Sequence, residues 1–279
     1  NIRFFEGENK IDDSFAKKLA GLGDIYVNDA FSCSHREQAS IHKITKYIKE
    51  SYAGPLLQKE VAAINAILEN KKKPVTCIIG GSKISTKINV ITNLIKNVDN
   101  IIIVGAMANN FLTFNGFIVG KSLLEKDTKE IIGNIYAEAE KYNCNIFIPE
   151  DCSVSNDFDG SRKIKKLESI GKEEIILDIG PETIKRIESI IDKSRTVLWN
   201  GPAGYFENKN FLTGTLAIAK KISESTSKNS LISILGGGDT ISAINKSKDN
   251  FAFTHLSTAG GAFLEFLEGK DLPGLNVLK

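Results

Sequence analysis

The sequence has few of the features from which disulfide frameworks, metal clusters and membrane spans are built. Its four cysteines show no C-x-x-C spacing, which argues against a zinc site or a disulfide framework and favours a reducing, cytoplasmic environment. Because no apolar run approaches the length of a transmembrane helix, we expect no membrane partner. The net charge of +2 is also too small to favour nucleic acid as a partner.

What the sequence does have is the composition of a large globular protein. Its 279 residues are 42% hydrophobic and 25% charged, and a chain of this length predicts two domains or one large α/β domain. The first residues, Asn1–Phe5, resemble a strand that is already under way. We therefore expect the chain to be the continuation of a longer protein.

The part of the chain before Pro74 has three predicted elements. Asp12 and Asp13 can cap a helix, and the run 24–31 alternates like a strand. From Leu57 to Leu68 apolar residues recur at helical spacing, with Gly-Pro before them and a lysine run and Pro74 after them. Breakers at both ends make this helix a candidate connector between two domains.

Beyond Pro74, short apolar runs alternate with helical patterns. The predicted strands are Val75–Ile79, Ile101–Val104, Asn145–Pro149, Glu174–Leu177, Thr196–Trp199 and Leu231–Leu235. The predicted helices are Ile84–Ile95, Lys126–Tyr142, Glu182–Ile191 and Leu212–Ile222, with a last one at Phe263–Leu267. This alternation predicts a largely parallel sheet covered by helices on both faces, with ligands beyond the carboxyl ends of its strands.

The glycine-rich turn Gly236–Thr240 lies at one such strand end. The following residues, Ile241–Ile244, resemble the first turn of a helix. Three glycines let the backbone approach a ligand closely, and the carboxylate of Asp239 beside a phosphate suits Mg²⁺. A corner in which glycine only relieves crowding is an equally good interpretation of this turn taken alone.

A second turn, Gly80–Lys87, carries two lysines. Ser82 can cap the predicted helix, which would place Lys83 and Lys87 on one face of its first turn. Two ammonium groups there repel each other and oppose the helix dipole, so they are costly unless an anion lies beside them. A polyphosphate site is therefore favoured over a solvated face, although the turn is not a Walker A loop.

Three further turns carry weaker signals. Gly105–Asn109 could let an adenine ring lie against the backbone, but tight helix packing is the better interpretation. Glu207, after Asn200-Gly-Pro, could accept hydrogen bonds from ribose hydroxyls or could be a surface residue. The turn 255–262 could offer backbone N–H groups to a transferred phosphoryl group.

The glycines at 236 and 238 were also compared with the G-x-G-x-x-G fingerprint of dinucleotide-binding proteins. The match fails because Ile241 occupies the position of the third glycine.

Taken together, these stretches resemble the phosphoglycerate kinase family over residues 1–279. The motifs that carry the resemblance are Asn1-Ile-Arg-Phe, Gly23-Asp-Ile-Tyr-Val-Asn-Asp-Ala-Phe, Ser34-His-Arg, Gly80-Gly-Ser-Lys, Leu177-Asp-Ile-Gly-Pro, Trp199-Asn-Gly-Pro, Gly236-Gly-Gly-Asp-Thr and Leu267-Glu-Gly-Lys-Asp-Leu-Pro-Gly. The resemblance implies a two-lobed α/β enzyme with a Rossmann-like sheet. It would move a phosphoryl group between 1,3-bisphosphoglycerate and ADP, with Mg²⁺.

The resemblance also implies a role for each matching residue. Lys83 would hold the transferring phosphoryl group, Asp239 would bind Mg²⁺ and Glu207 would bind the ribose. Contacts to the nucleotide phosphates would come from Lys87, Asn200 and Thr240. The nucleotide site would be shaped by Gly81, Gly105, Ala106, Leu177, Gly236 and Gly237. Backbone N–H groups of Gly238, Gly260 and Gly261 would face the migrating phosphoryl group, and Arg3 and Arg36 would bind the acid substrate.

The domain layout implied by the resemblance has four parts. They are a remnant of the substrate lobe at 1–56, an interdomain helix at 57–70, a nucleotide lobe at 71–256, and a segment at 257–279 that returns towards the first lobe. Family members carry a long segment before the Asn-x-Arg-Phe motif, so we expect this chain, as a monomer, to bind Mg²⁺-nucleotide but to transfer little phosphate. The alternatives are a non-catalytic nucleotide-binding module and an NAD-dependent dehydrogenase, which lacks its fingerprint.

Overall fold

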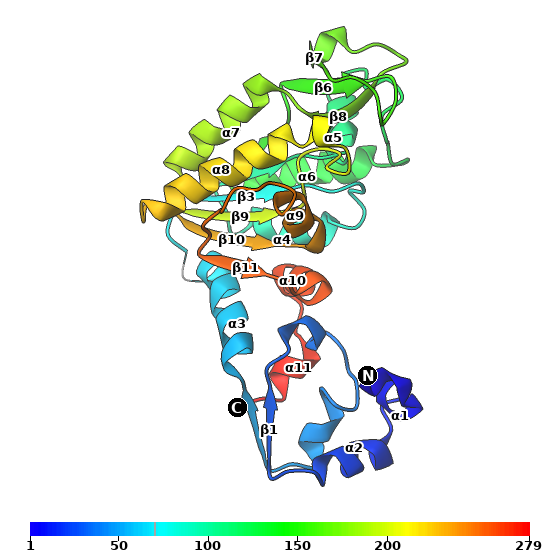
Figure 1. Ribbon diagram of the computed structural model, residues 1–279, viewed down its shortest axis with the longest axis vertical. Helices are drawn as coiled ribbons and strands as arrows, with labels where there is room; N and C mark the ends of the chain where they lie inside the picture. The colour runs from blue at the N-terminus through cyan, green and yellow to red at the C-terminus, as the bar shows by residue number, and fades with distance from the viewer. Residues whose placement is uncertain (70) are drawn as a thin grey trace. The chain divides into compact units, whose positions relative to one another are not determined.

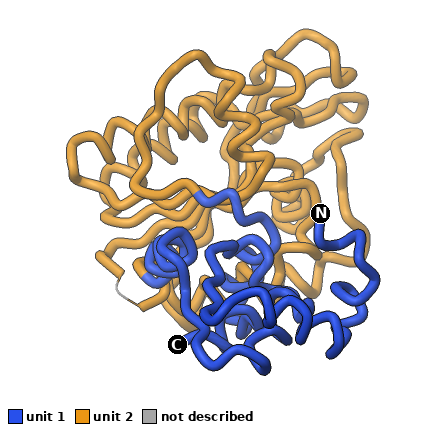
Figure 2. Tube along the Cα trace, turned by 60° about the horizontal axis from the view of Figure 1, so that its bottom comes forward, with its two compact units in different colours: residues 1–65, 257–279 blue, residues 66–256 orange. Residues whose placement is uncertain are grey.

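The computed structural model of the protein describes residues 1–69 and 71–279. Its internal contacts divide the chain into two compact units (Figure 2). Unit 1 consists of residues 1–65 and 257–279, and unit 2 consists of residues 66–256. The division falls within helix α3 (Pro55–Leu68). The predicted interdomain helix was extended to residue 70, which lies outside the described residues.

A six-stranded sheet forms the centre of unit 2 (Figure 1). Its strand order is β11 (His255–Ser257), β10 (Ile232–Gly236), β9 (Thr196–Asn200), β3 (Val75–Ile79), β4 (Asn100–Ile103) and β5 (Asn145–Phe147). The pairs from β10 through β5 are parallel. The predicted parallel sheet is therefore confirmed.

Helices follow most of these strands, as right-handed crossover connections require. They are α4 (Ile88–Ile95), α5 (Ala108–Phe114), α6 (Lys129–Lys141), α7 (Pro181–Lys193), α8 (Thr213–Ser227) and α9 (Gly238–Ile244). Helix α7 begins with Pro181. The first amide of a helix has no acceptor within the helix, so proline loses no hydrogen bond there. The helix buries Thr183, Ile187 and Ile191 along one stripe.

The core of unit 2 lies on both faces of the sheet. Ile78 and Ile102 pack in one cluster with residues of α7 and α8, which lie side by side (Figure 1). Side chains alternate along a strand, so Ile101 and Ile103 point to the opposite face, and both are 0% exposed. A strand covered on both faces has an almost continuous apolar sequence, which is why these runs could be recognised in advance.

A second, antiparallel sheet corrects one prediction. Strand β6 (Asp151–Ser155) pairs with β7 (Lys163–Lys166) and with β8 (Ile175–Ile179). The strand expected at Glu174–Leu177 exists as β8, but it belongs to this three-stranded sheet and not to the parallel one. A short apolar run shows that a strand is buried, and it carries no information about the direction of its neighbour.

Unit 1 is built from short elements. They are α1 (Glu6–Asn9), α2 (Asp13–Ala20), α10 (Gly260–Leu267), α11 (Pro273–Asn276), a parallel pair of β1 (Ile25–Asn28) and β2 (Glu50–Ala53), and 3₁₀ turns at Ile2–Phe4, Phe31–Cys33 and Lys43–Lys46. The predicted cap is confirmed at Asp12, which accepts a hydrogen bond from the Phe15 amide at 2.7 Å, whereas Asp13 is the first residue of α2 itself. The helix predicted at Phe263–Leu267 is α10, which begins three residues earlier, at Gly260, and the short helix α11 follows it.

The expected opening strand is wrong. Residues Ile2–Phe4 form a 3₁₀ turn, and the side chain of Asn1 accepts a hydrogen bond from the Arg3 amide. Phe4 is 86% exposed and Phe5 is 60% exposed. The segment does not pair with the two-stranded sheet β1–β2 of unit 1.

The last residues of the chain are fixed within unit 1 by backbone hydrogen bonds. The Gly274 amide donates to the Ser34 carbonyl at 2.8 Å, and the Lys279 amide donates to the Ser51 carbonyl at 3.0 Å. None of the helices in residues 1–69 and 71–279 is long and apolar enough to cross a membrane.

Candidate functional site

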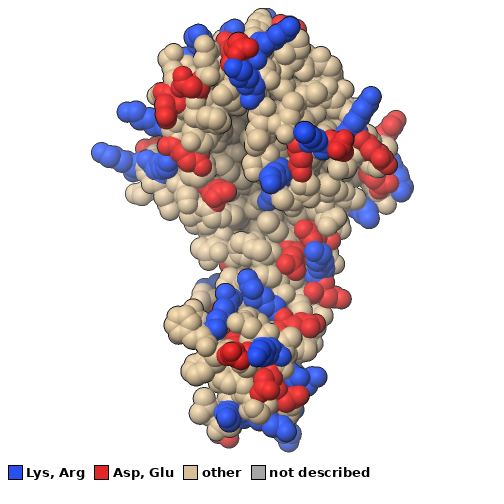
Figure 3. All heavy atoms as spheres, turned by 90° about the vertical axis from the view of Figure 1, so that its right-hand side faces the viewer, with Lys and Arg blue, Asp and Glu red and all other residues tan. Residues whose placement is uncertain are grey.

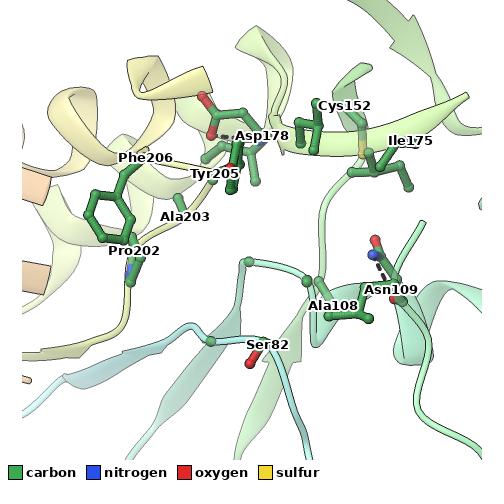
Figure 4. A pocket seen from close by; sticks show the side chains of 18 of the residues that line it. Ser82, Ala108, Asn109, Cys152, Ile175, Asp178, Pro202, Ala203, Tyr205 and Phe206 are labelled. Atoms are coloured by element: carbon green, nitrogen blue, oxygen red, sulfur yellow. Dashed lines mark hydrogen bonds between the residues drawn. The ribbon is translucent and has the colours of Figure 1, made fainter. Parts of the chain in front are cut away.

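A cavity of about 370 Å³ opens within unit 2, where the turns after β3, β4 and β9 meet β8 (Figure 4). In the sheet register Asn200 pairs with both Ile79 and Gly236, so three strands end at the same level. The turns that follow them therefore lie side by side. The residues predicted for the nucleotide or metal site that line the cavity are Gly81, Gly105, Ala106, Leu177, Glu207 and Asp239.

The turn after β3 and the turn after β9 are in direct backbone contact. The Gly80 amide donates to the Asn200 carbonyl at 2.8 Å. A Cβ on Gly201 would lie 2.3 Å from the Gly80 carbonyl oxygen, and the φ of Gly201 is 100°. Any other residue there would be both crowded and strained, so glycine is required for this close approach.

A hydrogen-bonded network joins the turn after β9 to the turn after β10. The Asn200 side chain donates to the Gly236 carbonyl at 2.9 Å, and the Gly201 amide donates to the Thr240 hydroxyl at 2.7 Å. The same hydroxyl donates to the Gly236 carbonyl at 3.0 Å, and Thr240 is 0% exposed. Asn200 and Thr240 therefore hold the walls of the cavity in place.

The helix after Gly236 begins earlier than expected. Helix α9 starts at Gly238 and ends at Ile244, so Ile241–Ile244 is its last turn and not its first. Gly237, with a φ of 100°, replaces a side-chain cap at the start. Asp239 consequently lies in the first turn with its side chain exposed at the cavity. A carboxylate is favourable there because the N-terminal end of a helix carries partial positive charge.

The predicted arrangement of the two lysines is wrong. Helix α4 begins at Ile88, with Lys87 as its N-cap residue and Lys83 in the preceding bends, so the two side chains do not share a helix face. Ser82 does not cap this helix. The segment is instead held by the Lys87 amide on the Ile84 carbonyl and by the Ser85 amide on the Glu125 carboxylate, at 2.8 and 3.1 Å.

The ammonium groups of the two lysines have different surroundings. Lys87 donates to the Asn200 side-chain oxygen, which ties it to the turn after β9. Lys83 is exposed. Two lysines on the first turn of a helix therefore do not indicate an anion site here. The remaining support for such a site is the ammonium group of Lys87, which is fixed between the turns after β3 and β9.

The loop after β9 closes one side of the cavity. The Tyr205 amide donates to the Leu177 carbonyl at 2.6 Å, and Lys246 donates to the carbonyls of Phe206 and Glu207 at 2.9 and 3.2 Å. The Tyr205 ring packs edge-on against Phe158, with centroids 5.1 Å apart. These contacts position the backbone of Glu207 while its side chain stays exposed.

One lining residue that the sequence did not single out is Asp178. It is 2% exposed, and its carboxylate accepts hydrogen bonds from the amides of Gly214 and Ile179 at 2.8 and 2.9 Å. Burial raises the pKa of this carboxyl to about 7. The sequence signal that could have identified Asp178 was its position directly after Leu177, which was predicted to shape the nucleotide site. The apolar side chains of Cys152 and Phe158, which also line the cavity, were missed as well.

Four predicted residues belong to unit 1. Arg3 and Arg36 are exposed, and Gly260 and Gly261 open helix α10. A Cβ on Gly261 would lie 3.4 Å from the His35 ring. Acidic and basic side chains are interspersed on the face drawn in Figure 3.

Comparison with known proteins gives a consistent result. The family model described as phosphoglycerate kinase matches residues 1–270. The chain is 48% identical over 284 residues to the phosphoglycerate kinase of Wolbachia sp. subsp. Drosophila simulans (strain wRi), covering 100% of this chain and 70% of that protein. It is 45% identical over 281 residues to the enzyme of Francisella tularensis subsp. novicida, covering 100% and 71%.

Solved structures agree with this assignment. The phosphoglycerate kinase of Coxiella burnetii superposes with a TM-score of 0.93 at 40% identity, over 99% of this chain and 71% of that one. The enzyme of Pyrococcus horikoshii gives a TM-score of 0.82 at 31% identity, over 100% and 71%. The chain thus spans about 70% of the length of these relatives. It belongs to the phosphoglycerate kinase family, the phosphotransferases whose acceptor is a carboxyl group.

Proposed function

We propose that unit 2 binds ADP or ATP with Mg²⁺ in its cavity, in the service of reversible phosphoryl transfer between 1,3-bisphosphoglycerate and ADP. The observation that carries the proposal is the convergence of three glycine turns, one fixed lysine and one exposed carboxylate at the ends of parallel strands. Ligands of α/β proteins bind at this edge of the sheet.

The nucleotide phosphates are assigned to the backbone of the turns. Gly81, Gly236 and Gly237 have no side chain to keep an anion away from their N–H groups. Lys87 and Asn200 add a cation and an amide at the same place. The hydroxyl of Thr240 is already occupied by Gly201 and Gly236, so we assign its phosphate contact to the backbone N–H.

Asp239 is the residue that suits Mg²⁺. Among the described residues no group of three or more His, Cys, Asp or Glu side chains could hold a metal ion alone. Mg²⁺ is usually bound by one or two carboxylates together with substrate phosphates, and the exposed carboxylate of Asp239 fits that donor set. When bound, the ion would neutralise charge on the phosphate oxygens.

The nucleoside is assigned to the wider part of the cavity. Glu207 would accept hydrogen bonds from the ribose hydroxyls, and Leu177 would pack against the base. Gly105 and Ala106 would let the other face of the base lie against the backbone. Gly105 also allows close contact between two turns, since a Cβ there would lie 2.9 Å from the Gly81 amide nitrogen.

The groups that act on the transferred phosphoryl group are proposed as Lys83 and the backbone N–H groups of Gly238, Gly260 and Gly261. Arg3 and Arg36 are proposed to bind the acid substrate. Phosphoryl transfer through a loose transition state needs positioning and charge neutralisation, which ammonium and N–H groups supply. No general base is needed, because the acceptor is already a carboxylate.

We further propose that these 279 residues, taken alone, bind Mg²⁺-nucleotide but transfer phosphate poorly. The proposed acid-substrate residues lie in unit 1, which exposes several large apolar side chains. The sheet of unit 1 has only two strands, and a loosely held site loses much of the benefit of positioning.

Calorimetric titration with ADP in the presence of Mg²⁺ tests the binding proposal. We expect saturable binding of one nucleotide per chain, and NADH should produce no heat. A folded sample that binds no ADP or ATP would overturn the proposal. In a coupled assay with 3-phosphoglycerate and ATP, slow or undetectable turnover is expected, and rapid turnover would contradict the second proposal.

A further inference from the structure

A glutamate from a distant loop holds the turn that lies between Lys83 and helix α4. In this turn, residues 84–87, the Lys87 amide donates to the Ile84 carbonyl at 2.8 Å. A β-turn bonds its first carbonyl to its fourth amide, so the second amide, that of Ser85, needs an acceptor elsewhere. The Glu125 carboxylate is that acceptor, at 3.1 Å.

This contact takes the place of a local helix cap. Side chains just before a helix usually accept hydrogen bonds from the amides at its start. The N-cap residue of α4, Lys87, makes no such side-chain bond. Glu125 reaches the segment from 40 positions along the chain, so the start of α4 depends on a tertiary contact.

Glu125 reaches the turn from a loop that is itself fixed. Its amide donates to the side-chain oxygen of Asn110, in α5, at 3.0 Å. Three residues earlier in the same loop, the Ser122 hydroxyl accepts a hydrogen bond from the Ile176 amide of β8 at 2.8 Å. The loop between α5 and α6 is therefore tied to both a helix and a strand of unit 2.

The carboxyl group of Glu125 is ionised at neutral pH. Hydrogen bonds from Ser85 hold its pKa below the usual value for a glutamate, and the nearby positive charge of Lys83 lowers the pKa further. Because Glu125 is partly exposed, water screens its attraction to Lys83. The directional hydrogen bond to the Ser85 amide is therefore the contact that can fix the turn.

Lys83 is the lysine whose position depends most on this turn. Its ammonium group makes no hydrogen bond or ion pair within residues 1–69 and 71–279, whereas Lys87 is bound to Asn200. The Lys83 carbonyl accepts a hydrogen bond from the Thr86 hydroxyl at 2.9 Å, which joins Lys83 to the turn. The place of Lys83 is therefore set through its backbone.

We propose that Glu125 is a positioning residue for phosphoryl transfer. By fixing the turn 84–87, it keeps Lys83 next to Ser82 at the cavity, where the lysine can meet the terminal phosphate of ATP. The inference rests on the proposed role of Lys83 in holding the transferring phosphoryl group. A misplacement of about 1 Å can cost about a hundredfold in rate, so an anchor that touches no substrate can still matter.

Binding of ATP and of ADP by Glu125→Ala tests this role. ATP carries the phosphoryl group that Lys83 would hold, and ADP lacks it. In calorimetry with Mg²⁺, Glu125→Ala should weaken ATP binding by about tenfold and ADP binding by less than about twofold. A general loosening of the fold would weaken both alike.

The outcomes separate this inference from the proposed function. If the wild-type chain binds both nucleotides and Glu125→Ala changes both affinities equally, or changes neither, the inference is overturned and the proposed function stands. A folded wild-type chain that binds neither nucleotide would overturn both.

Glu125→Gln and Glu130→Ala are the matched controls. Glutamine keeps an acceptor oxygen for the Ser85 amide and loses only the charge, so the ratio of ATP to ADP affinity should stay within about twofold of wild type. Glu130 is an exposed carboxylate in the first turn of α6, and Glu130→Ala should leave the ratio unchanged. A loss in Glu125→Gln as large as that in Glu125→Ala would show that charge acts and not position, which would overturn the inference.

A Lys83→Ala background shows whether Glu125 acts through Lys83. There, adding Glu125→Ala should cause no further loss of ATP affinity, because no lysine is left to position. Additive losses would contradict the inference. If Glu125→Ala does not fold, Glu125→Asp replaces it, since its carboxylate is one methylene too short for the Ser85 amide. It should show the same selective loss for ATP, and a wild-type ratio would overturn the inference.

Discussion

The two units of this chain differ in how completely their apolar side chains are buried. Unit 2 packs both faces of a parallel sheet, and Trp199 at its centre is 0% exposed. Unit 1 has a two-stranded sheet, and it leaves Phe4, Leu22 and Ile25 exposed at 86%, 84% and 60%. Unit 1 does bury side chains such as Phe31 and Phe263, so the contrast between the units is one of degree.

Because of this difference, we expect nucleotide binding to depend on unit 2 and phosphoryl transfer to depend on unit 1 as well. The cavity lies wholly in unit 2, and its walls are fixed by hydrogen bonds within that unit. Nucleotide binding should therefore depend little on unit 1. The residues proposed for the acid substrate, Arg3 and Arg36, depend on a unit that supplies little burial of its own.

The largest contrast between the units is expected for core substitutions. Ile102→Ala, at a position 2% exposed in β4, should lower the free energy of unfolding by about 2–5 kcal/mol. Ile25→Ala, at a position 60% exposed in β1, should change it by no more than about 0.5 kcal/mol. Urea unfolding followed by circular dichroism and by the fluorescence of Trp199, the single tryptophan, measures both. Similar losses at the two positions would remove the contrast.

A second prediction concerns the metal within unit 2. Asp239→Ala should weaken ADP binding in Mg²⁺ by about a hundredfold, since loss of an outer-shell partner alone costs roughly 10–100-fold in metal affinity. Without metal the loss should be small. Glu207→Ala removes another exposed carboxylate from the same cavity and should weaken binding alike under both conditions. Calorimetry with and without Mg²⁺ measures this, and equal losses for Asp239→Ala would refute the metal role.

The buried hydroxyl of Thr240 gives a third prediction. Thr240→Val keeps the shape of the side chain but leaves the Gly201 amide without its acceptor, which should reduce the free energy of unfolding of unit 2 by about 1–3 kcal/mol. Thr240→Ser retains the hydroxyl and should lose less. The urea midpoint read from Trp199 fluorescence compares them. No loss of stability in Thr240→Val would show that the hydroxyl does not hold the turns.

The last prediction concerns the pH dependence of stability and the buried carboxyl of Asp178. Its folded pKa of about 7 lies above the usual 3.8, so the folded state retains a proton that the unfolded state releases. Stability should therefore fall as the pH rises from about 4 to about 7, at up to about 1.4 kcal/mol per pH unit. Asp178→Asn should abolish this slope, and the exposed control Asp159→Asn should keep it. Parallel slopes for both variants, from urea unfolding at several pH values, would contradict the assignment.

Much of the fold of unit 2 was predictable because its strands are buried on both faces. Runs such as Val75–Ile79 then read as continuous apolar segments between breakers. The strand at 175–179 was also recognised, but its antiparallel partner β6 has the mixed sequence Asp-Cys-Ser-Val-Ser. Such a strand is buried through hydrogen bonding as well as apolar contact, so no hydropathy pattern identifies it.

Two errors in the candidate site concern the starts of helices. The start of α9 was misplaced because Gly237, which has no capping side chain, is its N-cap. The start of α4 was misplaced because residues 84–87 form a hydrogen-bonded turn before the helix begins at Ile88. The helix-face argument for Lys83 and Lys87 failed for this reason. The hydrogen bond from Lys87 to Asn200 joins residues 113 positions apart, which no local pattern can indicate.

Amide hydrogen exchange of the 279-residue chain, with and without ADP and Mg²⁺, tests the central claim most directly. We predict that nucleotide will protect the turns of unit 2 that line the cavity, at 80–83, 105–109, 175–179, 202–207 and 236–240. Exchange in residues 1–65 and 257–279 should change little, because all the residues that line the cavity belong to unit 2. Protection of unit 1 in place of these turns, or no protection at saturating nucleotide, would contradict the account.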